Sequence, residues 1–190
     1  MAKFKQTEIG EIPEDWEVIK LGDEQNFELI MGQSPPSSTY NKNCNGLPFL
    51  QGNSEFGAIS PKATIYCSAP AKEADKGDVL ISVRAPVGEV NIANQKYCIG
   101  RGVGAIRAKN GVHNFYLFYY FESVKNKLDS ISGGSTFKAI TKGQIETFQI
   151  PLPPVPEQKS IAEILSTADQ AISLVERERY RSLNGSGGGS

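Results

Sequence analysis

His113 is the only histidine of the chain, so catalysis that depends on a histidine base has a single candidate position. It follows Asn110-Gly111 at the expected start of a helix, where a capping or surface role is common for a polar side chain. A Ser-His-Asp or Cys-His arrangement needs a nucleophile and an orienting partner around the histidine, and the sequence points to neither. We therefore predict no catalytic residue in this chain.

Two short motifs have the residue types of cofactor loops but the wrong spacing. Gly100-Arg101-Gly102-Val103-Gly104 lacks both the G-x-G-x-x-G spacing and the Lys-Ser/Thr ending of a phosphate loop. Ser34-Pro35-Pro36-Ser37 lacks the amide or acid first residue and the aromatic fourth residue of the amino-methyltransferase tetrapeptide. The sequence contains no carboxylate pair followed by Glu-x-Lys, which is the pattern that would hold a metal ion for phosphodiester cleavage. We expect this chain to bind no cofactor and no metal.

The cysteines and the apolar segments indicate the class of protein. Cys44, Cys67 and Cys98 are an odd number and contain no C-x-x-C pair, which favours reduced thiols over a disulfide framework or a zinc site. The longest purely apolar run, Phe115 to Phe121, is too short to cross a bilayer. We therefore expect a cytoplasmic protein without a membrane partner.

Formal charge is unevenly distributed along a chain whose net charge is -1. Residues 1–30 hold 3 lysines against 8 carboxylates, residues 31–150 hold 13 basic against 8 acidic residues, and residues 151–190 hold 4 against 5. A modestly basic middle is compatible with contact to nucleic-acid phosphates, and equally with an ordinary mixed surface.

The elements that must position any site are predicted to be mostly short strands. Runs rich in β-branched and aromatic residues alternate with Gly, Asn, Pro and Asp, which favours an irregular, mostly antiparallel sheet structure. Helical spacing of apolar residues predicts one core helix over about residues 113–130, ended by Gly133-Gly134. The predicted strands are Trp16–Leu21, Phe27–Met31, Pro48–Gln51, Ala63–Cys67, Asp78–Val83, Glu89–Ile92, Tyr97–Ile99, Gly102–Ala108 and Thr147–Ile150.

A proline-rich segment, Pro151 to Pro156, predicts an extended connector and a boundary, because proline cannot continue a sheet ladder. Beyond it, Glu157 to about Ser182 has the pattern of a second helix with one apolar face. That face could fold back on its own domain or pair with another helix as a coiled coil, and we predict pairing. The predicted division is a domain over 1–153, a spacer helix with a proline hinge over 154–183 and a flexible tail over 184–190. The residues expected to pair are Ile161, Ile164, Leu165, Ala168, Ile172 and Val175.

Several motifs, taken together in their order, resemble one protein family. The opening segment Ile12-Pro13-Glu14-Asp15-Trp16-Glu17-Val18-Ile19-Lys20-Leu21-Gly22-Asp23 is similar to the start of target-recognition domains in type I restriction-modification specificity subunits. The further matching segments are Gly32–Pro36 with Tyr40, Pro48–Asn53, Gly77–Gly88, Cys98–Gly102, Gly134–Ile140 and Ile150–Ala162. Each motif is weak alone, but their order over residues 8 to about 175 is specific.

The resemblance implies an α+β fold, in which an irregular, mostly antiparallel β target-recognition domain is followed by a long C-terminal coiled-coil-type helix. Family members normally carry two such domains on two antiparallel helices, whereas this chain has one of each, which suggests a half-subunit whose helix pairs with that of a second copy. The family reads one half of a bipartite site in double-stranded DNA with each domain. The resemblance also implies methyltransferase (modification) subunits, which bind S-adenosylmethionine and methylate adenine, and a restriction/motor subunit as partners.

Polar side chains next to the predicted turns are the candidate DNA contacts. Gln, Asn, Ser, Thr and Arg read base edges, whereas Lys mostly binds phosphate. Alternatively, the glycines and prolines only shape turns and Arg84 forms an internal salt bridge. The predicted DNA-contacting residues are Gln33, Ser34, Ser37, Thr39, Tyr40, Gln51, Asn53, Arg84, Arg101, Ser135, Thr136 and Lys138.

Two other functions fit the sequence. The chain could be the recognition domain cut from a single-chain restriction-methyltransferase enzyme, or a protein-interaction adaptor that uses the Ile161–Val175 helix without nucleic acid. Salt-insensitive or absent DNA binding would favour the adaptor, because phosphate contacts weaken as salt rises.

Overall fold

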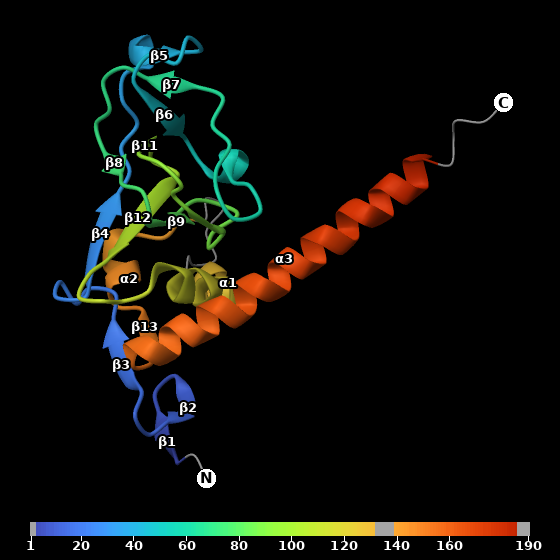
Figure 1. The fold of residues 1–190 in the computed structure, drawn as a ribbon. Helices are drawn as coiled ribbons and strands as arrows, with labels where there is room; N and C mark the ends of the chain where they lie inside the picture. The colour runs from blue at the N-terminus through green and yellow to red at the C-terminus, as the bar shows by residue number, and fades with distance from the viewer. Residues whose placement is uncertain (1–2, 132–138, 186–190) are drawn as a thin grey trace.

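The computed structural model describes residues 3–131 and 139–185, with side chains through Arg181. A sheet-rich body carries a long helix that projects away from it (Figure 1). The strands are β1 Phe4–Thr7, β2 Gly10–Pro13, β3 Glu17–Lys20, β4 Phe27–Met31, β5 Tyr40–Asn41, β6 Leu47–Leu50, β7 Tyr66–Cys67, β8 Glu73–Ala74, β9 Val79–Ser82, β10 Val90–Ile92, β11 Tyr97–Ile99, β12 Val103–Ala108 and β13 Gln149–Leu152. The helices are α1 Asn114–Ile131, α2 Lys142–Glu146 and α3 Val155–Gly185, with short 3-10 turns at Ser37–Thr39 and Asn53–Glu55.

The described strands form two larger sheets and two strand pairs. One sheet has the order β10-β9-β12-β4, and the other has the order β5-β7-β6-β11-β8. Within the described residues, every pair of named strands is antiparallel except β11 with β6, which is parallel. The prediction of an α+β fold with an irregular, mostly antiparallel sheet is confirmed.

Helix α1 packs its apolar face on the four-stranded sheet, and this contact is the main core. Leu117, Phe121 and Leu128 are fully buried, as their helical spacing predicts. The Tyr116 hydroxyl, also inside the core, donates a 2.7 Å hydrogen bond to the Pro151 carbonyl of β13. This bond joins the sheet-covering helix to the strand that leads into α3.

The proline-rich segment differs from the prediction of an extended connector. Pro151 lies within β13, opposite Val18 of β3. Proline is tolerated there because β13 is paired on one side only, so its missing N–H does not interrupt a ladder on the other side. Helix α3 then begins at Val155, with Pro156 in its first turn, where a missing N–H costs no helical hydrogen bond.

The start of α3 is held against the body, and its later part is not. The Trp16 indole N–H donates to Glu157 at 2.9 Å. The buried Gln158 side chain accepts from the His113 N–H at 2.9 Å and donates to the Pro153 carbonyl at 2.7 Å. The Tyr119 hydroxyl bonds Asp169 at 2.9 Å, and residues 170–181 are all exposed. No helix in the described part of the chain is long and apolar enough to cross a membrane.

Candidate functional site

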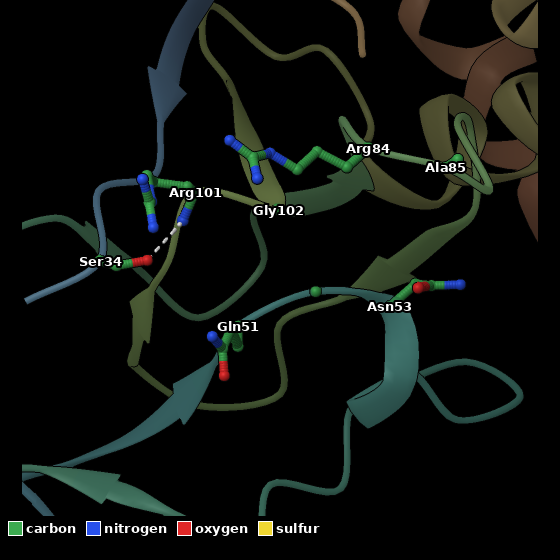
Figure 2. A pocket seen from close by; sticks show the side chains of 8 residues that line it. Ser34, Gln51, Asn53, Arg84, Ala85, Arg101 and Gly102 are labelled. Atoms are coloured by element: carbon green, nitrogen blue, oxygen red, sulfur yellow. Dashed lines mark hydrogen bonds between the residues drawn. The ribbon is translucent and has the colours of Figure 1, made fainter. Parts of the chain in front are cut away.

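A cavity of about 220 Å³ opens between four segments that follow strands of both sheets. It brings together five of the residues that the sequence singles out, from positions 34 to 101 along the chain. The lining residues are Ser34, Gln51, Gly52, Asn53, Arg84, Ala85, Arg101 and Gly102 (Figure 2).

Tight backbone contacts around Gly102 build the floor of this cavity. The Gly102 N–H donates to the Gln51 carbonyl at 3.1 Å, and the Gly100 N–H donates to the Leu50 carbonyl at 2.8 Å. A Cβ atom at position 102 would lie 2.4 Å from the Gln51 carbonyl oxygen, so only glycine allows the two turns to approach this closely. Leu50 and Ile99, which precede the two turns, are fully buried, and the turns therefore rest on a packed core.

Hydrogen bonds to neighbouring segments hold the backbone at or next to each of the two arginines of the cavity. The Arg101 N–H donates to the Ser34 hydroxyl oxygen at 3.2 Å. Arg84 is the second residue after β9, and the N–H of the intervening Val83 donates to the Gly102 carbonyl at 2.9 Å. Figure 2 shows the Arg84 side chain stretched from its turn toward Arg101, with the Ser34 bond on the other side of Arg101. Both arginine side chains are exposed.

The electrostatics of the cavity are those of an anion-accepting surface. Among the described residues, its lining contains two guanidinium groups and no carboxylate. Among the described residues, neither Arg84 nor Arg101 makes an ion pair, so the alternative of an internal salt bridge for Arg84 finds no support there. The amide groups of Gln51 and Asn53 likewise have no side-chain hydrogen bond to any described residue. The cavity therefore presents hydrogen-bond donors that the fold itself does not use.

A second cavity of about 250 Å³ adjoins the first, because Gln51 lines both. Tyr40 also lines it and packs on Phe49, with ring centroids 4.7 Å apart. Asn41, a polar loop residue that the sequence also suggested for DNA contact, completes the wall together with Lys42, Glu55 and Ile65. Lys42 and Glu55 gave no sequence signal, because nothing in the chain indicated that the 40–42 and 51–55 segments lie side by side.

Other predicted contact residues lie outside the first cavity. Thr39 and Tyr40 are occupied in shaping their own loop, since the Thr39 hydroxyl donates to the Pro36 carbonyl at 2.7 Å and the Tyr40 hydroxyl donates to the Pro35 carbonyl at 2.8 Å. Gln33 and Ser37 are exposed on that loop. The remaining predicted residues, Ser135, Thr136 and Lys138, lie outside the described residues.

The groups that could suggest catalysis lie away from the arginine cavity. His113 sits at the junction of α1 and α3, where burial and the positive charge of Lys159 lower its pKa. Cys67 and Cys98 are buried free thiols and Cys44 is an exposed one. Burial raises the pKa of Cys98 to about 12, so this thiol is protonated at neutral pH and a poor nucleophile.

The predicted pairing face of α3 is divided by the structure. Ile161 packs against the body's own core, and this differs from the predicted pairing role. Further along, the side chains of Ile164, Ile172 and Val175 are 68%, 57% and 64% exposed, and Leu165 is 39% exposed. Ala168 is also exposed.

Comparisons with known proteins agree with this architecture. Residues 13–184 match the family described as type I restriction modification DNA specificity domain. A putative type I restriction enzyme MjaX specificity subunit from Methanocaldococcus jannaschii is 55% identical over 93% of this chain and 42% of the relative. A second relative from that organism, the type I restriction enzyme MjaIX specificity subunit, is 34% identical over 93% of this chain and 43% of its own length.

Solved structures show the same fold. The HsdS subunit from Thermoanaerobacter tengcongensis has a TM-score of 0.78 and 43% identity, covering 92% of this chain and 42% of that one. A chain from a structural study of assembly and conformational transition in the type I R-M system has a TM-score of 0.82 and 44% identity, covering 94% of this chain and 44% of that one. This chain thus spans less than half the length of these relatives. The family predicted from the ordered motifs is confirmed, and the chain belongs to the type I restriction modification DNA specificity domain family.

Proposed function

We propose that this chain is a sequence-specific DNA-recognition module that binds double-stranded DNA with the arginine cavity and the loops beside it. The observation that carries the proposal is the gathering of Arg84 and Arg101 with unused amide and hydroxyl donors in a recess whose described lining has no carboxylate. Such a surface attracts the polyanionic duplex and offers the side-chain types that contact it. Membership of the specificity-domain family supports the same conclusion independently.

In this function the chain reads one half of a bipartite site and performs no chemistry. Methylation and cleavage belong to partner polypeptides, namely a methyltransferase subunit that binds S-adenosylmethionine and a restriction/motor subunit. The buried thiol of Cys98 and the location of His113 at a helix junction are consistent with this division of labour.

Selection of bound sequences from random duplexes tests the proposal. The full chain would be used alone and together with a methyltransferase subunit, and bound duplexes would be sequenced after several rounds. We expect a half-site consensus, and a bipartite one where two recognition modules are joined. Enrichment of no consensus under either condition would contradict sequence-specific recognition.

Helix α3 supports a second part of the proposal, which is pairing with another α3-type helix. Ile164, Ile172 and Val175 are more than half exposed although they are spaced for one helical face. Burying such a face is what drives two helices into a coiled coil. A partner helix on this face would hold two recognition modules at a set distance along the duplex.

Self-association is tested by the solution mass of the full chain and of the Ile172→Asp variant. We expect a dimer for the natural sequence and a monomer for the variant, because a charge in the seam is costly to bury. Lys127→Ala, an exposed change on α1, serves as the control and should leave the mass unchanged. A monomer for the natural sequence at high concentration would contradict self-association.

A further inference from the structure

We propose that the arginine cavity holds a backbone phosphate of the duplex and does not read a base edge. This inference rests on the proposed DNA binding and assigns a ligand to the cavity. It divides the surface into a part that positions the protein and other loops that specify sequence.

Shape is the first argument. Base edges lie at the floor of a groove, about 8.5 Å deep for the major groove, so a side chain that reads them must project from the protein. The cavity is instead a recess of about 220 Å³ between four segments of the chain. A recess can surround only what projects from the duplex, and phosphate groups are the features that line its outer ridges.

Hydrogen-bonding chemistry is the second argument. A phosphodiester accepts hydrogen bonds and donates none, and the cavity offers the donors to match it. The Ser34 oxygen already accepts from the Arg101 N–H, which leaves its own O–H free to donate outward. Arg84 and Arg101 add two guanidinium groups, which suit phosphate oxygens in a bidentate geometry.

Rigidity is the third argument. The bond from the Val83 N–H to the Gly102 carbonyl ties the Arg84 turn directly to the Arg101 turn. The close approach of Gly102 to Gln51 also holds the Arg101 turn against the segment that contains Gln51. The two arginine side chains therefore extend from backbone segments that are bonded to each other. One anion can engage both guanidinium groups without reordering the chain.

The first experiment compares sequences. Affinities of the full chain and of Arg84→Ala, Arg101→Ala and the double variant would be measured on the consensus duplex and on a scrambled duplex. We expect the double variant to lose about 10- to 100-fold on both duplexes alike. Lys127→Ala, which removes one positive charge outside the cavity, should lose far less. Thermal unfolding of each variant would establish that it is folded.

The second experiment locates the ligand. Duplexes carrying a single neutral methylphosphonate would be scanned position by position. We expect one position whose neutralisation weakens the natural chain but leaves the double variant unaffected, because the double variant has already lost that contact. The slope of log affinity against log salt should also fall in magnitude by about 0.9 in the double variant.

Each outcome has a defined meaning. If the natural chain binds no duplex, the proposed function fails. If it binds DNA and the arginine variants either behave like the natural chain or lose affinity only for duplexes with one particular base pair, DNA recognition stands and the phosphate assignment fails. Saturable binding of inorganic phosphate without any effect of the variants on duplex affinity would instead assign the cavity to a free anion and contradict the inference.

Discussion

Two arginines lie near the opposite ends of strand β12 and have different surroundings. Near its far end, Arg107 is held by Asp78 through bonds of 3.1 and 2.9 Å, by Asp75 at 2.7 Å and by Glu28 at 3.6 Å. Just before its start, Arg101 lines a recess whose described lining contains no carboxylate. The same side chain serves the fold where carboxylates surround it and is available to a ligand where they do not.

The difference shows how the body separates stability from recognition. Asp78 is 3% exposed, so Arg107 compensates a buried charge and its charge is used internally. Its pKa is raised chiefly by the hydrogen bond to Asp78, which keeps it charged at every physiological pH. The Arg84 and Arg101 side chains are instead exposed to solvent, at the edge of a rigid framework.

The largest expected effect comes from removing the structural arginine. Arg107→Ala should lower the free energy of unfolding by about 3 kcal/mol, at the low end for a buried pair because Arg107 is 28% exposed. Chemical denaturation of this variant and of Arg84→Ala measures the contrast. Arg84→Ala should stay within about 0.5 kcal/mol of the natural chain. Equal losses in both variants would erase the distinction between the two regions.

A smaller effect is expected where the recognition turn depends on the core. Gly102→Ala places a Cβ atom 2.4 Å from the Gln51 carbonyl oxygen, so the backbone must shift. We expect a loss of about 1–3 kcal/mol in unfolding free energy together with weaker DNA binding. Gly143→Ala in α2 is the matched control, since no atom lies within 4 Å of its added Cβ. The control should be neutral or slightly stabilising, and the idea of a tightly fitted turn is wrong if both variants behave alike.

Salt concentration should affect DNA binding by Arg84 and Arg101 more than it affects the stability that Arg107 contributes, and this difference should be smaller than the effects of the substitutions above. Exposed charges that bind DNA are screened and compete with counterions, whereas a buried pair is screened much less. Raising salt should therefore shrink the affinity difference between the natural chain and the Arg84→Ala/Arg101→Ala variant. The unfolding-energy difference between the natural chain and Arg107→Ala should change little over the same range. Binding titrations and denaturation curves at matched salt concentrations provide the measurement.

The smallest effect concerns pH. Burial and Lys159 lower the pKa of His113, so the folded chain favours its neutral form. The unfolded chain then binds the proton more readily, so this contribution to stability is complete above about pH 6.5 and is lost as pH falls below it. Unfolding free energy measured on either side of that pH should fall less in His113→Gln than in the natural chain. An identical pH dependence in both would remove His113 as the cause.

Much of the fold was predictable from local pattern. The bounds of β4 and β11 agree with the predicted strands, and α1 begins and ends within one residue of its prediction. Alternating or helically spaced apolar residues carry that information locally. The β1–β2 hairpin and the five-residue α2 were not predicted, because both are too short or too polar to produce a periodic signal.

The proline segment and the helix face show where local reasoning fails. Pro151 joins a strand because β3 pairs with it on one side only, which is a property of the sheet and not of the residue. Ile161 and Ile164 belong to one apolar stripe in the sequence, yet the first contacts the body and the second is 68% exposed. The side of α3 on which each residue lies decides the difference, because Asp169, further from the docked start than Ile164, still bonds Tyr119 of the body.

The family, the α+β class and the residue types available for DNA contact were predictable before any coordinates, because ordered motifs and side-chain periodicity are local properties of the chain. Folding was needed to show that Ser34, Gln51, Asn53, Arg84 and Arg101 line one cavity while Arg107 is paired with Asp75 and Asp78. That outcome depends on strand order and on backbone approaches such as Gly102 to Gln51, which join positions far apart in the chain. Whether a charge is free or paired follows from its neighbours in space, and those neighbours exist only once the sheets have assembled.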